Sequence, residues 1–204
     1  MKIVLAAASL LVLPACDMIA PSPPQTPKVN YRPEEAGTVD HALCLLGFTI
    51  IPLREARGTG HHLVVATVNG KDGMFILDTG ANLSVIDSDH VALFGLAGAR
   101  GRPGGATGLG GSNAARQVPI ESLAFGPVKL RQRRMVVTDL GSIGDALAPL
   151  AGGAVHGIIG QDVLKEHRAV IDVERPLLYL IEADEDPEPV PAERCRAKRQ
   201  AAAK

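Results

Sequence analysis

Short stretches of alternating or continuous apolar residues recur along the chain, a pattern typical of β-strands rather than of long helices. Asn69-Gly70 follows one such stretch, residues 62–68, and precedes another that ends at Leu77. Because Asn-Gly accepts the positive φ angles of a tight reversal, these two stretches are expected to form a β-hairpin. The predicted strands span residues 49–53, 62–68, 74–77, 117–125, 128–138, 169–173 and 177–181. The chain is therefore predicted to be mainly β.

Three short helices are expected among these strands. One begins at Ser88 or Asp87 and continues through residues 90–96, and the others span residues 142–150 and 161–167. Residues 98–111 are rich in glycine and are expected to be flexible.

The two ends of the chain differ in composition from the middle. Prolines at five positions between residues 20 and 37 favour an extended linker, and residues 183–204 are acidic and then basic, which predicts a disordered tail. We therefore expect a signal segment at 1–16, a linker at 17–47, one folded domain at 48–182 and a charged tail at 183–204. The 204 residues are enough for one core of ordinary size.

Composition excludes several classes of protein. A formal net charge of −1 gives no basic field for nucleic acid, and two Tyr, four Phe and no Trp provide little surface for stacking bases. The six His residues lack the spacing of metal ligands, so no metal site is expected. No cofactor is implied.

The candidate chemistry lies at Asp78, which directly follows the apolar run 74–77. A carboxylate at the end of a buried strand needs compensating contacts, because desolvation of an unpaired charge is costly. Gly80 lets backbone N–H groups approach the carboxylate, and the Thr79 hydroxyl is a further donor for the turn. An ordinary Asx turn at the end of a strand explains the same three residues, so Asp-Thr-Gly alone does not establish a catalytic site.

Three motifs together resemble the retropepsin-like aspartic peptidases. Residues 78–86, DTGANLSVI, resemble the catalytic loop of that family, and residues 157–162, GIIGQD, resemble its second signature before a short helix. The glycine-rich residues 104–111 lie between them, where the family has its flap. The resemblance covers roughly residues 49–182.

The resemblance implies a closed, mainly β barrel that forms a homodimer, in which Asp78 of each subunit activates water to hydrolyse a peptide bond. It assigns Asp78, Thr79 and Gly80 to the catalytic turn. The residues expected to cover a peptide substrate are Gly108, Leu109, Gly110 and Gly111. Those expected to support the site are Ala81, Asn82, Ile158, Ile159 and Gly160.

The chain departs from the family at two positions. Gln161 stands where many retroviral members have an Arg, and Asn82 stands where its acidic partner would be. An amide pairing between the two side chains is expected to substitute for the missing ion pair. A second carboxylate at the end of an apolar strand, Asp139, lies too close in sequence to Asp78 to begin a second lobe, and it is interpreted as a strand-ending Asp.

An alternative function from another class fits the same residues. A catalytically silent module that binds extended peptides or other envelope proteins would have the same fold. The intact Asp-Thr-Gly favours the enzyme, because a binding-only site would gain from losing two close carboxylates.

The first residues predict export. Lys2 precedes the apolar run 3–13, which is too short to span a membrane. Residues 13–16, LPAC, resemble the lipobox of bacterial lipoproteins, which implies lipidation of Cys16, and Asp17 resembles a signal for retention at the inner membrane. We expect a lipid-anchored protein on the periplasmic side of that membrane, with a soluble periplasmic or secreted protein as the alternative.

Two cysteines remain if Cys16 is lipidated. In an oxidising compartment Cys44 and Cys195 are candidates for a disulfide. The sequence does not decide between a bond and two free thiols, because Cys195 lies in the segment expected to be disordered.

Overall fold

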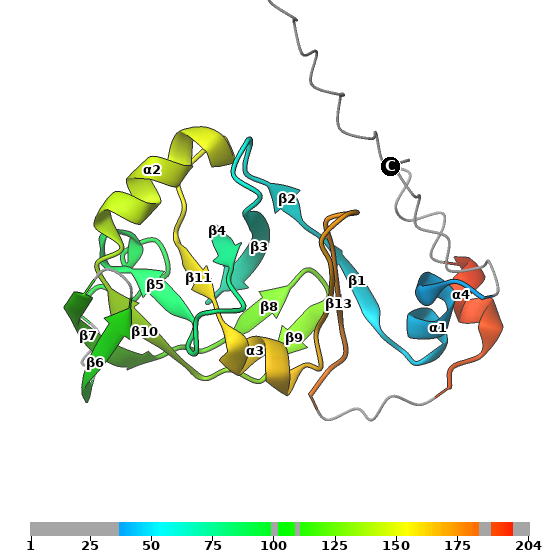
Figure 1. The fold of residues 1–204 in the computed structure, drawn as a ribbon. Coiled ribbons are helices and arrows are strands. Elements are labelled where there is room, and N and C mark those ends of the chain that lie inside the picture. Colours follow the sequence, from blue (N-terminus) through cyan, green and yellow to red (C-terminus); the bar gives the residue numbers. More distant parts are fainter. Residues whose placement is uncertain (1–36, 99–101, 109–110, 184–188, 198–204) are drawn as a thin grey trace, which may run out of the picture.

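The computed structural model describes residues 37–98, 102–108, 111–183 and 189–197, with side chains for 37–98, 115–183 and 189–195. Short strands dominate this part of the chain (Figure 1). The strands are β1 (Thr49–Pro52), β2 (Arg54–Glu55), β3 (His62–Val68), β4 (Lys71–Leu77), β5 (Val85–Asp87), β6 (Arg102–Gly108), β7 (Gly111–Pro119), β8 (Leu123–Phe125), β9 (Val128–Leu130), β10 (Arg134–Thr138), β11 (Gly157–Ile159), β12 (Val170–Asp172) and β13 (Leu177–Leu180). The helices are α1 (Val39–Leu45), the 3-10 helix η1 (Ser88–His90), α2 (Gly141–Ala151), α3 (Gln161–Glu166) and α4 (Ala192–Ala197). The predicted mainly β class is confirmed.

One large curled sheet contains most of the strands. Its order is β6-β7-β10-β5-β11-β4-β3-β8-β9, and β2 pairs with β3. Within it β4 and β11 run parallel, with Leu77 opposite Ile159. Because parallel strands end at the same edge of a sheet, the segments that follow β4 and β11 emerge side by side.

The predicted hairpin is confirmed in its register. β3 and β4 pair antiparallel from Val68 opposite Lys71, and Asn69 and Gly70 form the turn with φ angles of 49° and 76°. These are the positive φ values of a type I′ turn, whose twist matches that of the strands. The turn therefore fixes the register of β3 against β4, and with it which side chains of β4 face the core.

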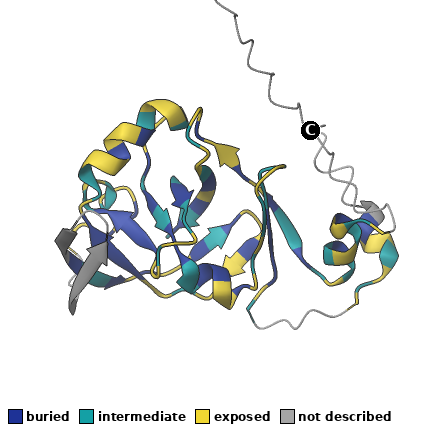
Figure 2. Ribbon diagram, in the orientation of Figure 1, coloured by how far each residue is buried: buried dark blue, intermediate teal, exposed yellow. Residues whose placement is uncertain are grey.

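Buried residues are concentrated on the strands of the large sheet (Figure 2), and their apolar side chains form the main hydrophobic core. Phe75, Ile86, Phe125 and Ile159 are each fully buried there. Since these residues come from β4, β5, β8 and β11, the core fixes the two strands that lead into the candidate site.

A second, three-stranded sheet has the order β1-β13-β12. It lies between the large sheet and the pair of helices α1 and α4 (Figure 1). Cys44 of α1 and Cys195 of α4 form a disulfide, and the N–H of Val190 donates to the carbonyl of Leu45 at 2.6 Å. Two segments from opposite ends of the chain are thus joined.

A buried polar cluster connects α1 to the hairpin β12–β13. Asp40, which is 2% exposed, accepts hydrogen bonds from the Tyr179 hydroxyl at 2.6 Å and from Arg175 Nη1 at 2.7 Å. Arg175 also pairs with Asp172, with 2.6 Å between Nη2 and Oδ2. Burial and then the bond to Asp40 raise the pKa of Tyr179 above its ordinary value.

The structure differs from several of the expected boundaries. Residues 90–96 are not a helix; the helical segment is η1, with Asp87 as its N-cap. Two long predicted strands are each broken, at residues 120–122 and 131–133. In the first break the Asn69 side chain accepts from the N–H groups of Glu121 and Ser122 at 2.7 and 3.2 Å.

Other differences lie in segments expected to lack structure. The glycine-rich residues 102–108 form β6, which pairs with β7. Helix α1 lies inside the expected linker, and α4 lies inside the expected tail. Among the described residues, no helix has the length and apolar character needed to cross a membrane.

Candidate active site

Asp78 is the first residue after β4, and it begins a turn of residues 78–82 that we call the Asp78 turn. Its N–H donates to the carbonyl of Ile159 at 3.0 Å, which continues the pairing of β4 with β11 by one residue. The Asp78 side chain is half-buried. Two core strands therefore present a carboxylate at the edge of the sheet, where it is accessible to solvent.

The carboxylate is oriented by the backbone of its own turn. The N–H of Gly80 donates to Asp78 Oδ1 at 2.7 Å, and the N–H of Ala81 donates to the Asp78 carbonyl at 3.3 Å. A Cβ on residue 80 would lie 3.1 Å from the same Oδ1, so a side chain there would crowd the carboxylate. A short backbone hydrogen bond to an ionised oxygen favours one rotamer of the side chain.

The exposed Thr79 contributes its carbonyl to the described contacts. This oxygen accepts from Gln161 Nε2 at 2.5 Å. The expected pairing of Gln161 with Asn82 is therefore not the arrangement observed. Asn82 is exposed, and its carbonyl accepts from the N–H of Asp162 at 3.2 Å.

Helix α3 begins directly against the Asp78 turn. The N–H of Gln161 donates to the carbonyl of Ala81 at 2.8 Å, so the turn supplies an acceptor to a helix whose N-cap, Gly160, has no side chain. A Cβ on residue 160 would lie 2.7 Å from the Ala81 carbonyl oxygen. Glycine is thus required at this position for the close approach of turn and helix.

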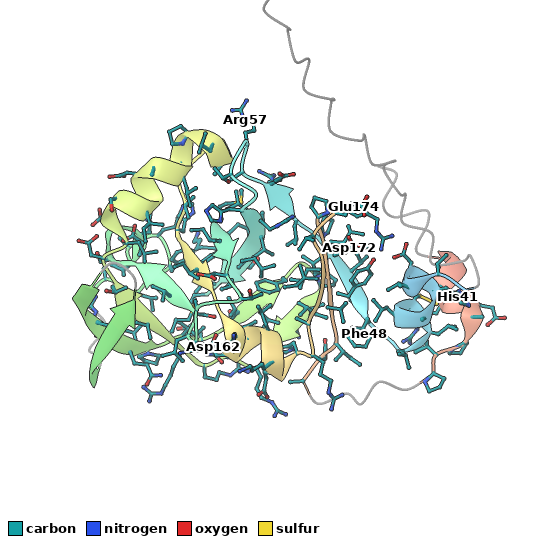
Figure 3. All side chains as sticks on the ribbon, in the orientation of Figure 1. His41, Phe48, Arg57, Asp162, Asp172 and Glu174 are labelled. Carbon is teal, nitrogen blue, oxygen red and sulfur yellow. A yellow bond between two sulfur atoms is a disulfide. The ribbon has the colours of Figure 1, made fainter. Side chains whose placement is uncertain are left out.

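Asp162 connects three segments beneath the turn, and Figure 3 labels it beside α3. Its carboxylate accepts from the N–H of Ser84 at 3.0 Å, from Ser84 Oγ at 2.7 Å and from Gln132 Nε2 at 2.7 Å. Ser84 is fully buried, and its Oγ accepts in turn from the N–H of Gly160 at 3.0 Å. The network links the end of the Asp78 turn to the start of α3.

Sequence reasoning missed the role of Asp162, Ser84 and Gln132. The signal available was a carboxylate in the first turn of a predicted helix, which is common at helix N-termini and points to no particular partner. Nothing in the local pattern indicates that a serine 78 residues earlier is its partner.

The apolar residues of the second signature lie below the turn. Ile159 is fully buried in the main core, and Ile158 is half-buried and packs against two smaller apolar clusters. Among the residues expected to cover a substrate, Gly108 and Gly111 pair at the end of the hairpin β6–β7. Leu109 and Gly110 lie outside the described residues, as does Cys16.

Asp139, the other carboxylate at the end of a predicted strand, lies far from this turn. It follows β10, which runs parallel to β5, and β5 runs antiparallel to β11. The end of β10 therefore lies at the edge opposite to Asp78.

In the part of the chain that the structure describes, no group of three His, Cys, Asp or Glu side chains is arranged to hold a metal ion.

One comparison with known protein families matches the part of the chain that contains the Asp78 turn. The sequence profile of a family described as aspartyl protease matches residues 64–163. That range includes β4, the Asp78 turn, β11 and the beginning of α3. No curated protein matches the sequence significantly.

Several solved structures are similar, at low identity. A retropepsin-like aspartic protease from Rickettsia conorii is 22% identical, with 66% of this chain and 89% of that chain covered and a TM-score of 0.45. The retroviral protease-like domain of Ddi1 from Leishmania major is 19% identical, with coverages of 64% and 94% and a TM-score of 0.43. The EIAV protease, in complex with the inhibitor HBY-793, is 22% identical, with coverages of 54% and 90% and a TM-score of 0.38. The family match over residues 64–163, where β4, the Asp78 turn and β11 lie, makes this part of the chain similar to the aspartyl protease family.

Proposed function

We propose that this protein is an aspartic endopeptidase in which two copies of Asp78, one from each subunit of a homodimer, activate a water molecule. The observation that carries the proposal is the Asp78 carboxylate, half-buried at the edge of two parallel core strands and oriented by the Gly80 N–H at 2.7 Å. The family match over residues 64–163 supports the assignment.

The chemistry requires two carboxylates that share one proton. The ionised carboxylate takes a proton from water while the water oxygen attacks the carbonyl carbon of the peptide. The protonated carboxyl gives its proton to the carbonyl oxygen, which produces a tetrahedral diol. When the diol collapses, the C–N bond breaks and a proton passes to the nitrogen, so the products are a carboxylic acid and an amine.

A second copy of the chain supplies the second carboxylate in this proposal. Asp139 lies at the opposite edge of the sheet, as the strand directions require. A two-fold axis beside the Asp78 turns would bring equivalent carboxylates together, which is the ordinary symmetry of a homodimer.

One strand edge is suited to such a contact. β12 pairs with β13 on one side and has no partner strand on its other side among the described residues. Val170 on this strand is 38% exposed, and Val173 just beyond it is 68% exposed. β12 follows α3 by a few residues, and the first residues of α3 are hydrogen-bonded to the Asp78 turn. At the opposite edge of the small sheet, β1 follows α1 directly in the chain.

The hairpin β6–β7 is proposed to cover an extended peptide. Its strands pair from Arg102 opposite Gln117 to Gly108 opposite Gly111. A hairpin of this kind can add strand-like hydrogen bonds to a substrate and exclude water.

We further propose that the protein is exported to the bacterial periplasm and attached to the inner membrane through a lipid on Cys16. The disulfide between Cys44 and Cys195 supports an oxidising compartment. The alternative is a soluble periplasmic or secreted protein.

The test uses the purified protein with a diverse mixture of peptides between pH 4 and pH 8. Asp78→Asn is nearly isosteric but cannot act as the base, so we expect cleavage to fall by at least about a hundredfold. Asp139→Asn is the matched control and should cleave like the wild type. If Asp78→Asn retains the wild-type rate, the assignment of Asp78 is wrong. Peptide binding without cleavage by the wild type would instead support the silent binding module.

A further inference from the structure

We propose that Gln161 is a positioning residue that orients the Asp78 carboxylate through the peptide unit between Thr79 and Gly80. Gln161 Nε2 donates to the carbonyl of Thr79 at 2.5 Å, and the N–H of Gly80 donates to Asp78 Oδ1 at 2.7 Å. The acceptor of the first bond and the donor of the second belong to the same peptide unit. The inference rests on the proposed function of Asp78.

The peptide unit transmits orientation because it is planar. Its C=O and N–H groups lie in one plane and point in opposite directions in the trans form. When the carbonyl is fixed by Gln161, the direction of the Gly80 N–H is fixed as well. That N–H selects the rotamer of the Asp78 side chain, and a group rigidly oriented before the reaction loses less entropy in the transition state.

The other contacts between α3 and the turn come from the backbone. The N–H groups of Gln161 and Asp162 donate to the carbonyls of Ala81 and Asn82 at 2.8 and 3.2 Å. Any residue except proline could make these two bonds at positions 161 and 162. The bond to the Thr79 carbonyl comes from the side chain, so the identity of residue 161 decides whether this bond is made.

The amide of Gln161 donates to the Thr79 carbonyl without adding a charge beside the carboxylates. The position of Gln161 at the start of α3, with its backbone already bonded to Ala81, leaves only the side-chain torsions to be fixed.

Two substitutions separate this role from simple packing. Gln161→Met keeps the length of the side chain and removes the donor at every pH. Gln161→Glu keeps the shape, donates to the Thr79 carbonyl when protonated and repels it when ionised, with a changeover near the ordinary glutamate pKa of about 4.3. Lys165→Met, at an exposed position of the same helix, is the control.

The first measurement is amide hydrogen exchange of the full chain by NMR, which does not depend on activity. In Gln161→Met we expect the Gly80 amide to exchange at least about five times faster than in the wild type, while Val163 and core residues such as Phe75 keep their protection. Unchanged exchange at Gly80, or an equal loss of protection throughout the sheet, would overturn the inference. Lys165→Met should match the wild type.

The second measurement is the pH dependence of peptide hydrolysis. We expect kcat of Gln161→Met to fall about five- to tenfold at every pH, with KM within about twofold of the wild-type value, since the carboxylate is misdirected and the substrate site is retained. The ratio of kcat for Gln161→Glu to that of the wild type should rise as the pH falls below about 5. A ratio that is constant with pH would contradict the role. If the wild type cleaves no peptide, the proposed function fails, and hydrogen exchange alone decides the inference.

Discussion

Ser84 and Asp162, 78 residues apart in the sequence, are joined by two hydrogen bonds, from the N–H of Ser84 at 3.0 Å and from its Oγ at 2.7 Å. Asp162 accepts a third bond from Gln132 Nε2. The pair connects the segment that leaves the Asp78 turn to the first residues of α3, so the candidate site is assembled around a carboxylate that takes no part in the proposed chemistry.

Removing this carboxylate should destabilise the protein. In Asp162→Ala the buried Ser84 N–H and hydroxyl and the Gln132 amide lose their acceptor, and we expect the free energy of unfolding to fall by about 2–3 kcal/mol. Urea unfolding measures the change. Asp145→Ala, at an exposed position of α2, is the control and should alter stability by no more than about 0.5 kcal/mol. An equal effect of the two substitutions on the free energy of unfolding would show that the hydrogen bonds of Asp162 do not stabilise the protein.

A methyl group at residue 160 should push the Asp78 turn away from α3. In Gly160→Ala the new Cβ would lie 2.7 Å from the carbonyl oxygen of Ala81 and 2.8 Å from that of Leu83, both backbone atoms. We expect a loss of about 1–3 kcal/mol in the free energy of unfolding and a lower kcat. Gly153→Ala is the control, because a Cβ there has no atom within 4 Å. Wild-type stability and activity in Gly160→Ala would contradict the close approach.

His156 should make the folded state sensitive to acid. Burial, and then repulsion from the neighbouring His90, hold the pKa of His156 below its ordinary value of 6.5. Its Nδ1 accepts from the Met74 N–H at 3.0 Å, which requires that nitrogen to be unprotonated. A lowered pKa in the folded state means that the unfolded chain binds more protons near pH 6.5, so the stability is present above pH 6.5 and is lost as the pH falls through the folded-state pKa.

The measurement is urea unfolding at pH 7.5 and pH 5.0. His156→Gln keeps an acceptor for the Met74 N–H but does not titrate, so its loss of stability between the two pH values should be smaller than that of the wild type. His61→Gln, at an exposed position, is the control. An identical pH dependence in His156→Gln and the wild type would refute the prediction.

The disulfide should contribute strongly to stability, because Cys44 and Cys195 are 151 residues apart. In the chain-entropy model a loop of this length corresponds to up to about 5 kcal/mol. We expect Cys44→Ala/Cys195→Ala to unfold at lower urea than the oxidised wild type, and reductant to affect only the wild type. Alkylation of both thiols in native protein isolated without reductant, detected by mass spectrometry, would show that the bond is absent in the cell.

Activity should depend on dimerisation, since one chain supplies one Asp78. Specific activity should fall on dilution in parallel with the dimer fraction measured by sedimentation. Val170→Lys places a charge on the open edge of β12, at a side chain 38% exposed, and should weaken the dimer and the activity together. Val65→Lys on β3, at a side chain 39% exposed, is the matched control. A monomer whose specific activity is constant on dilution would refute the dimeric mechanism.

The sequence by itself determined the local elements of this protein. Asn69-Gly70 and the flanking apolar alternation predicted the hairpin β3–β4, and Ser142 to Leu150 predicted α2, because turn chemistry and periodicity act between near neighbours in the chain. The apolar run before Asp78 likewise placed a carboxylate at a strand end. The expected strand boundaries were wrong where a side chain distant in sequence binds the backbone, as Asn69 does between β7 and β8.

Only the tertiary structure decided which distant segments meet. The parallel pairing of β4 with β11 brings Asp78 to α3, and the partners of Asp162, Asp40 and Cys44 lie 78, 135 and 151 residues away. Local propensity carries no information about such partners. They are selected because a buried carboxylate must find donors and an apolar strand must be covered on both faces, and these requirements are satisfied only when the whole chain has folded.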